Sequence, residues 1–121
     1  MSEQFDAGRP IYAQLVERLK ARILAGTYPP GGHLDSVRDL AAAAGVNPNT
    51  MQRAMQELEA RGLINTQRTA GRTITEDETM IQALRQQKAQ EQIAQFWAAM
   101  QKLGFTQAEA LSLLKQTKEN A

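Results

Sequence analysis

The sequence predicts a mostly α fold (small α+β), in which three short helices and one β-hairpin are followed by two further helices. Three observations support this class. Apolar residues recur at intervals of three and four along most of the chain, which is the spacing of one helical face. Glycine or proline separates these stretches. A single pair of β-prone runs lies on either side of residues 68–71.

The first helix is expected to begin at Pro10, because the missing N–H of proline costs no hydrogen bond at the first helical position. Its apolar stripe repeats every four residues and consists of Ile11, Leu15, Leu19 and Ile23. Gly26 suits the left-handed conformation that ends many helices, and the prolines and glycines of 28–32 cannot continue one. The first helix is therefore predicted to end near Gly26.

Two short helices follow, separated by a tight turn at Gly45. Ser36, with Asp39 three residues later, is a capping signal for the second helix. Asn47 caps the third helix, and Pro48 occupies its first position. The residues expected to face the core from this pair are Leu40, Ala41, Met51, Ala54, Met55 and Leu58. Two helices joined in this way form a helix-turn-helix, in which a small residue lets the helices cross closely.

The β-prone runs 63–67 and 72–75 predict a short hairpin, which in this place is the wing of a winged helix-turn-helix. Residues 76–103 contain no Gly or Pro and are rich in Gln, Ala and Glu, so one long helix is expected there. Thr106, with Glu109 three residues later, caps a last helix. We therefore expect a winged helix-turn-helix domain over residues 8–75 and a two-helix tail over residues 76–121.

The composition excludes several kinds of chemistry. The sequence has no cysteine, which rules out a disulfide scaffold, thiol catalysis, zinc ribbons and iron–sulfur sites. The single histidine, His33, leaves no His-rich metal site and no familiar catalytic triad. The apolar stretches are shorter than the roughly 18 residues of a membrane helix, and the first residues do not follow the order of a signal peptide. We expect a cytoplasmic protein that is not an enzyme, uses no metal or cofactor, and does not enter a membrane.

The outward side of the third helix carries polar side chains suited to reading DNA. They are Asn47, Asn49, Thr50, Gln52, Arg53 and Gln56, with no carboxylate among them. Asn and Gln side chains can hydrogen-bond adenine, Arg can bond guanine, and a helix N-terminus favours phosphate. On the hairpin, Arg68 and Arg72 can reach phosphates or the minor groove. The alternative is an ordinary pair of helices whose charges lie on solvated faces.

Five runs carry a resemblance to a known family: 10–15 (Pro-Ile-Tyr-Ala-Gln-Leu), 23–31, 34–41 (Leu-Asp-Ser-Val-Arg-Asp-Leu-Ala), 45–54 (Gly-Val-Asn-Pro-Asn-Thr-Met-Gln-Arg-Ala) and 57–64. They resemble the GntR family of bacterial transcription regulators, almost continuously over residues 10–75. The short tail is similar to that of the YtrA-type subfamily. The resemblance implies a homodimeric repressor that binds a pseudo-palindromic operator on double-stranded DNA, in this subfamily often one that controls transporter genes.

The resemblance also implies which residues contact DNA. Transferred by position, they are Arg38, Asn47, Asn49, Thr50, Gln52, Arg53, Arg68, Thr69, Gly71 and Arg72. This chain departs from the family pattern at two places. Asp35 stands where the family usually has Pro, and the wing has Thr69-Ala70-Gly71 where the family usually has Gly-x-Gly.

The tail is expected to form the dimer, because residues 76–121 are too few to enclose a core alone. The expected interface residues are Ile93, Phe96, Trp97, Met100, Leu103, Phe105, Leu111 and Leu114. Together they form a patch too apolar for a monomer surface, and a twofold pairing would bury it on both chains. The alternative for the cluster of Phe96, Trp97 and Met100 is a ligand pocket. Whether a small-molecule effector exists stays open.

A different function is compatible with the same fold, namely a winged-helix module that binds another protein and has no specific affinity for DNA. Titration with random DNA at two salt concentrations separates the two, because binding to phosphates weakens steeply with salt. An enzyme is the weakest alternative, since the aminotransferase fusions related to the GntR family carry a large cofactor domain that this chain lacks.

Overall fold

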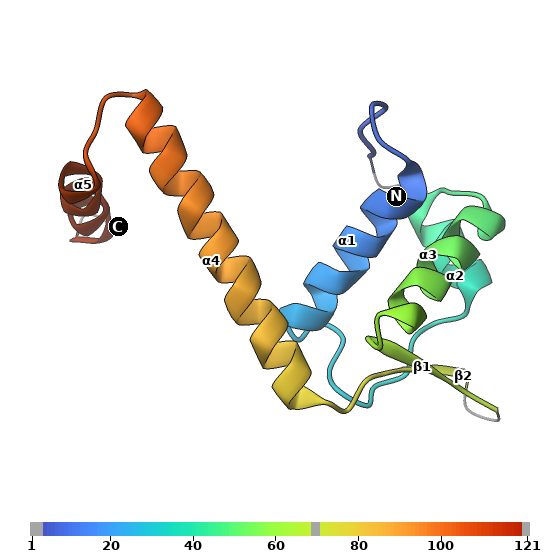
Figure 1. The fold of residues 1–121 in the computed structure, drawn as a ribbon. Helices are drawn as coiled ribbons and strands as arrows, with labels where there is room; N and C mark the ends of the chain where they lie inside the picture. The colour runs from blue at the N-terminus through green and yellow to red at the C-terminus, as the bar shows by residue number, and fades with distance from the viewer. Residues whose placement is uncertain (1–3, 69–70, 120–121) are drawn as a thin grey trace. The chain divides into compact units, whose positions relative to one another are not determined.

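The structure is a computed structural model that describes residues 4–68 and 71–119. It consists of α1 (Ile11–Leu24), α2 (Val37–Ala44), α3 (Pro48–Ala60), β1 (Ile64–Gln67), β2 (Gly71–Ile74), α4 (Glu78–Lys102) and α5 (Gln107–Glu119) (Figure 1). The predicted mostly α class with one small sheet is confirmed. The chain divides into two compact units, Met1–Ala83 and Leu84–Ala121. The division falls within α4 and not at residue 75, where the composition of the sequence changes.

Three helices build the core of the first unit, with α3 packed against both α1 and α2. The predicted apolar stripes of the helices and the hairpin region supply this core. Its largest fully buried side chains are Leu15, Val16, Ile23, Met51, Met55, Leu58, Leu63, Ile64 and Ile74. Ala41 and Ala54 are 0% exposed, and their small side chains let α2 and α3 approach closely. Helix α1 begins at Ile11, because Pro10 takes the N-cap position just before it and not the first helical position.

Local capping determines where α2 and α3 begin and end. The Ser36 hydroxyl oxygen accepts a hydrogen bond from the Asp39 N–H at 3.1 Å, at the start of α2. Gly45 ends α2 with a φ of 72°, a left-handed conformation that glycine adopts without steric cost. Asn47 caps α3, and Pro48 is its first residue. These features agree with the helix-turn-helix that the sequence predicts.

The hairpin of β1 and β2 is antiparallel, and the loop before α2 pairs with it. Ile74 exchanges backbone hydrogen bonds with this loop: it accepts from the Gly31 N–H at 3.0 Å and donates to the Gly32 carbonyl at 2.8 Å. The Leu34 N–H donates to the Arg72 carbonyl at 3.0 Å. The sequence did not predict this pairing. It ties the wing to the segment that leads into the helix-turn-helix.

In the second unit, Gly104 reverses the chain after α4 with a φ of 94°. The cap of α5 is reciprocal: the Thr106 N–H donates to Glu109 Oε1 at 3.0 Å, and the Glu109 N–H donates to Thr106 Oγ1 at 3.2 Å. The Thr106 backbone N–H, and then its hydroxyl, hold the pKa of the exposed Glu109 carboxyl below its ordinary value. Across the described residues, no helix combines the length and the apolar character needed to cross a membrane.

Candidate nucleic-acid interface

The N-terminal half of α3 presents a polar surface without a carboxylate. The α3 side chains that face the core are at most 2% exposed, and they are Met51, Ala54, Met55 and Leu58. Asn49 and Arg53 are exposed, while Thr50 and Gln52 are half-buried. The first acidic residue along the helix is Glu57. The packing of α3 thus orients a run of hydrogen-bonding side chains toward solvent.

Asn47 has a structural role at this end of α3. Its Oδ1 accepts a hydrogen bond from the Asn49 N–H at 2.7 Å, which satisfies one of the free backbone donors of the first turn. Asn47 is itself exposed. A contact from Asn47 to DNA therefore has to use the amide nitrogen or the second lone pair of Oδ1.

Arg53 is held by an aromatic ring that no sequence pattern indicated. Its Cζ lies 3.7 Å from the centroid of the Tyr12 ring, which belongs to the first turn of α1. At this distance the guanidinium makes a cation–π contact with the ring face. No spacing rule joins residues 12 and 53, because their contact depends on how α1 packs against α3.

This contact borders an open hollow of about 380 Å³ beside the N-terminal half of α3. The residues that line the hollow are Pro10, Ile11, Tyr12, Asn49, Thr50 and Arg53. Ile11 is 44% exposed, although the sequence pattern assigned it to the apolar stripe. The first turn of α1 therefore adjoins the residues predicted to contact DNA and adds apolar surface there.

The start of α2 carries one cation, Arg38, and two nearby carboxylates, Asp35 and Asp39. Arg38 is exposed in the first turn of α2. Asp35 is also exposed and lies just before the Ser36 cap. Asp35 lines a hollow of about 230 Å³ together with Arg18 and Arg22 of α1. The exposed Asp39 carboxylate directly follows Arg38 on α2 and lowers the positive potential there.

The two arginines of the wing lie in different environments. Arg68 is exposed in the turn after β1. Arg72, on β2, is half-buried, and its Nε is buried with no hydrogen-bond partner among the described residues. Gly71 begins β2 with a φ of 73° and has open space around it. Thr69, the remaining residue predicted for this contact, lies outside the described residues. Arg68 is thus better placed than Arg72 to meet a phosphate.

Two other polar residues of the first unit have structural partners. His33 forms a β-bridge with Thr73 at the edge of the hairpin. Arg61 makes an ion pair with Glu57 at 3.1 Å, four residues back along the chain, so its charge is partly offset. In the described ranges 4–68 and 71–119, no group of three or more His, Cys, Asp or Glu residues could hold a metal ion.

The residues predicted for the dimer interface leave apolar surface open to solvent in the second unit. The exposed members are Ile93 (51%), Leu103 (72%), Phe105 (37%), Leu111 (46%) and Leu114 (44%). The half-buried members are Phe96, Trp97 and Met100. The Phe96 and Trp97 rings pack together with their centroids 5.0 Å apart. All eight predicted residues are thus at least partly exposed to solvent in the single chain.

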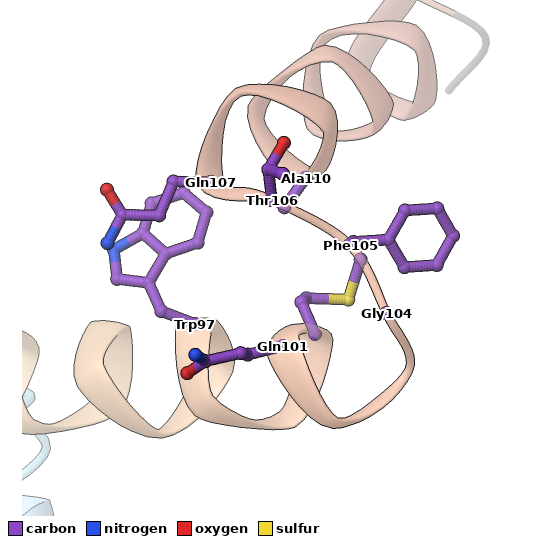
Figure 2. Close-up of a pocket in the computed structure, with 8 residues that line it drawn as sticks. Trp97, Gln101, Gly104, Phe105, Thr106, Gln107 and Ala110 are labelled. Carbon is purple, nitrogen blue, oxygen red and sulfur yellow. The ribbon is translucent and has the colours of Figure 1, made fainter.

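The second unit has almost no core of its own. Among its described residues, only Ala110 is buried. A hollow of about 310 Å³ lies where the end of α4 meets α5, between Trp97 and Ala110 (Figure 2). The ring of Phe105 points away from this hollow (Figure 2).

Comparison with known families identifies the first unit. Residues 11–74 match the family described as bacterial regulatory proteins, gntR family. Over 115 residues the chain is 35% identical to the uncharacterized HTH-type transcriptional regulator YhcF of Bacillus subtilis, covering 95% of each protein. It is 44% identical over 68 residues to the HTH-type transcriptional repressor YtrA of B. subtilis, covering 56% of this chain and 52% of that protein.

Solved structures share the fold, two of them along nearly the whole chain. A GntR family transcriptional regulator from Listeria monocytogenes superposes with a TM-score of 0.82 at 39% identity, covering 93% of this chain and 98% of that one. A transcriptional regulator from Oenococcus oeni gives a TM-score of 0.77 at 28% identity, covering 97% of this chain and 96% of that one. The AraR DNA-binding domain in complex with operator ORX1 matches at 22% identity and a TM-score of 0.53, covering 62% of this chain and 92% of that one, and shows the shared fold alone.

Proposed function

Since the chain belongs to the GntR family of bacterial regulatory proteins, and within it to the YtrA type, we propose that it is a homodimeric repressor of transcription. Family membership makes it a DNA-binding transcription regulator. In the proposal, the dimer binds a pseudo-palindromic operator in the cytoplasm and excludes polymerase by occupying the DNA. It acts by binding and not by catalysis. The word repressor in the name of the similar protein YtrA supports the direction of control.

The observation that carries the proposal is the carboxylate-free N-terminal half of α3. Its exposed end begins at the Asn47 cap, and its first acid is Glu57. An α-helix fits the major groove, where Asn or Gln can pair with adenine and Arg with guanine. We assign base reading to Asn49 and Gln52.

The remaining predicted contacts position the protein on the DNA backbone. Arg38 at the start of α2 and Arg53 on α3 lie on the two helices of the helix-turn-helix, and Arg68 extends the basic surface to the wing. Thr50 lines the same hollow as Arg53, and Gly71 lies on the wing. The Thr50 hydroxyl and the Gly71 backbone N–H can each bond a phosphate. Positive side chains at these places supply affinity that does not depend on sequence.

The dimer is supported by the exposed apolar residues of the second unit. A monomer presents one recognition helix, whereas a pseudo-palindrome requires two helices about 34–36 Å apart in successive major grooves. A twofold pairing through Ile93, Leu103 and Leu111, among others, would remove their exposed apolar surface from water on both chains.

The experiment that tests the proposal is footprinting of the purified protein on the DNA upstream of its own gene. We expect one protected region containing two inverted half-sites, and we expect the affinity to fall steeply between low and moderate salt. Binding to random duplex DNA alone, with no protected region, would contradict a specific operator. Absence of salt-dependent binding to any DNA would favour the protein-interaction module.

A further inference from the structure

The stacked pair of Tyr12 and Arg53 joins two elements that are far apart in the sequence. The Arg53 Cζ lies 3.7 Å from the Tyr12 ring centroid. Tyr12 is half-buried, whereas Arg53 is exposed. The next apolar residues of α1 that face the core, Leu15 and Val16, are 1% and 2% exposed, so the helix that carries the ring is firmly packed. The ring is therefore a fixed support for a side chain that would otherwise move freely in solvent.

The surroundings of Arg53 leave its charge available. Glu57 lies one turn further along α3, at the i+4 spacing that favours an ion pair with Arg53. Its carboxylate is instead paired with Arg61 at 3.1 Å. A guanidinium that stacks by its face on an aromatic ring still has its N–H groups along its edge, where they can bond phosphate or guanine.

The pair of Tyr12 and Arg53 lies on the surface that contacts DNA in the proposed function. Asn49 and Arg53 are four positions apart on α3, and both line the hollow that Tyr12 borders. An unsupported arginine loses rotamer freedom when it binds DNA, and a side chain already held in place loses less.

We propose that Tyr12 is a positioning residue for Arg53: its ring holds the guanidinium by one face and directs the N–H edge toward DNA. This inference rests on the proposed function, in which Arg53 contacts DNA. Tyr12 itself need not touch DNA for the effect. In this proposal, the first turn of α1 helps to orient a side chain of the helix-turn-helix that contacts DNA.

The test is a double-mutant cycle in the full chain, with a random-sequence DNA duplex of about 30 base pairs as the probe at several salt concentrations. Tyr12→Leu removes the aromatic face and should weaken binding about three- to tenfold, the range that corresponds to the cost of ordering one long side chain on binding. Tyr12→Phe keeps the face and should bind within about twofold of the parent. In the Arg53→Ala background, Tyr12→Leu should change nothing further.

The salt dependence separates positioning from a direct contact. Arg53→Ala should flatten the slope of log K against log salt by about one unit, because one phosphate is no longer neutralised. Tyr12→Leu should lower the affinity and leave the slope near that of the parent. Tyr28→Leu, which removes a half-buried tyrosine elsewhere in the first unit, is the matched control and should bind as the parent does.

Two results would overturn the inference while leaving the proposed function intact. One is an equal loss from Tyr12→Leu in both Arg53 backgrounds, and the other is a loss in Tyr12→Phe as large as in Tyr12→Leu. Failure of the parent chain to bind the duplex would overturn the proposed function and the inference together. If Tyr12→Leu does not fold, pentafluorophenylalanine at position 12 replaces it, because fluorination reverses the charge of the ring face at nearly constant size. Parent-like binding by that protein would overturn the inference.

Discussion

Asn47 and Asn49 are joined by a hydrogen bond of 2.7 Å from the Asn49 N–H to the Asn47 Oδ1, at the end of α3 that faces DNA in the proposed function. One side chain thus ends the loop, starts the helix and lies beside a base-reading residue. Stability and recognition are coupled here, because a change at Asn47 alters the first turn on which Asn49 is carried.

Asn47→Ala should cost about 1 kcal/mol of unfolding free energy, the usual value of an N-cap, and should also weaken DNA binding. Asn47→Asp keeps a capping oxygen and should restore the stability, yet bind DNA less well because it places a carboxylate near phosphate. Urea unfolding measures the first effect, and DNA titration measures the second. DNA binding by Asn47→Asp equal to that of the parent would place Asn47 away from the phosphates.

Asn49→Ala or Gln52→Ala should lose about 1–3 kcal/mol of binding free energy on the operator and relax the base preference at one position. Both side chains extend from α3 within its first two turns. Gln90→Ala, on the exposed middle of α4, is the control and should bind as the parent does. Equal losses on operator and scrambled DNA would show that these residues do not read bases.

Arg38→Ala should weaken binding to all duplex DNA and flatten the salt dependence by about one unit of slope. Asp35→Asn should bind at least as tightly as the parent, because it removes a negative charge close to the proposed phosphate contact. Titrations at several salt concentrations check both. An unchanged slope would mean that Arg38 neutralises no phosphate, and weaker binding by folded Asp35→Asn would mean that the carboxylate supports the fold of this loop.

Local signals in the sequence predicted the element boundaries well, and nonlocal contacts were missed. The cap of α2 at Ser36 and the reciprocal cap of Thr106 and Glu109 involve residues three apart, so the amino-acid types alone indicate them. The stack of Tyr12 on Arg53 requires the packing of α1 on α3, which no local pattern encodes. The same holds for the backbone pairing of the loop before α2 with the hairpin.

In the candidate site too, the sequence predicted the features that depend on local pattern and missed those that depend on contacts between distant residues. Periodicity indicated which side of α3 is buried, and Met51 and Met55 are buried as expected. It did not indicate that Arg72 would be half-buried while Arg68 is exposed. Arg72 lies on β2, whose backbone bonds both β1 and the loop at Leu34, whereas Arg68 lies in the turn after β1. The assignment of each residue to DNA stays a prediction that the variants above test.

The Glu109 carboxyl should make the helicity of α5 depend on pH. Its pKa is lowered by the Thr106 hydrogen bonds, so the charged form stabilises the folded cap, and this contribution is present above the unfolded pKa of about 4.3. It is lost as pH falls through the lower, folded pKa. Glu109→Gln keeps an acceptor for the Thr106 N–H and should remove this part of the pH dependence. NMR titration of Glu109 checks the shift, and Thr106→Ala should return its pKa toward the ordinary value.

The last prediction concerns the dimer. Trp97→Glu places a charge within the cluster of Phe96, Trp97 and Met100, and burying an unpaired charge in an apolar interface is costly. We expect a monomer in sedimentation, with weak and nearly nonspecific DNA binding because two linked recognition helices are lost. Gln90→Glu adds the same charge on an exposed part of α4 and should remain a dimer.

A shortened chain tests the same interface without a new charge. It should end after Ala83 and not after Thr75, because Ile81 is only 8% exposed and belongs to the first unit. Removing Ile81 would open the core of the winged helix and confuse loss of folding with loss of dimerisation. The chain that keeps it should fold as a monomer, since the apolar surface assigned to the interface lies beyond residue 83. If the shortened chain still forms a dimer, the interface lies in the winged helix. Pairing of the first units would then set the spacing of the two α3 helices.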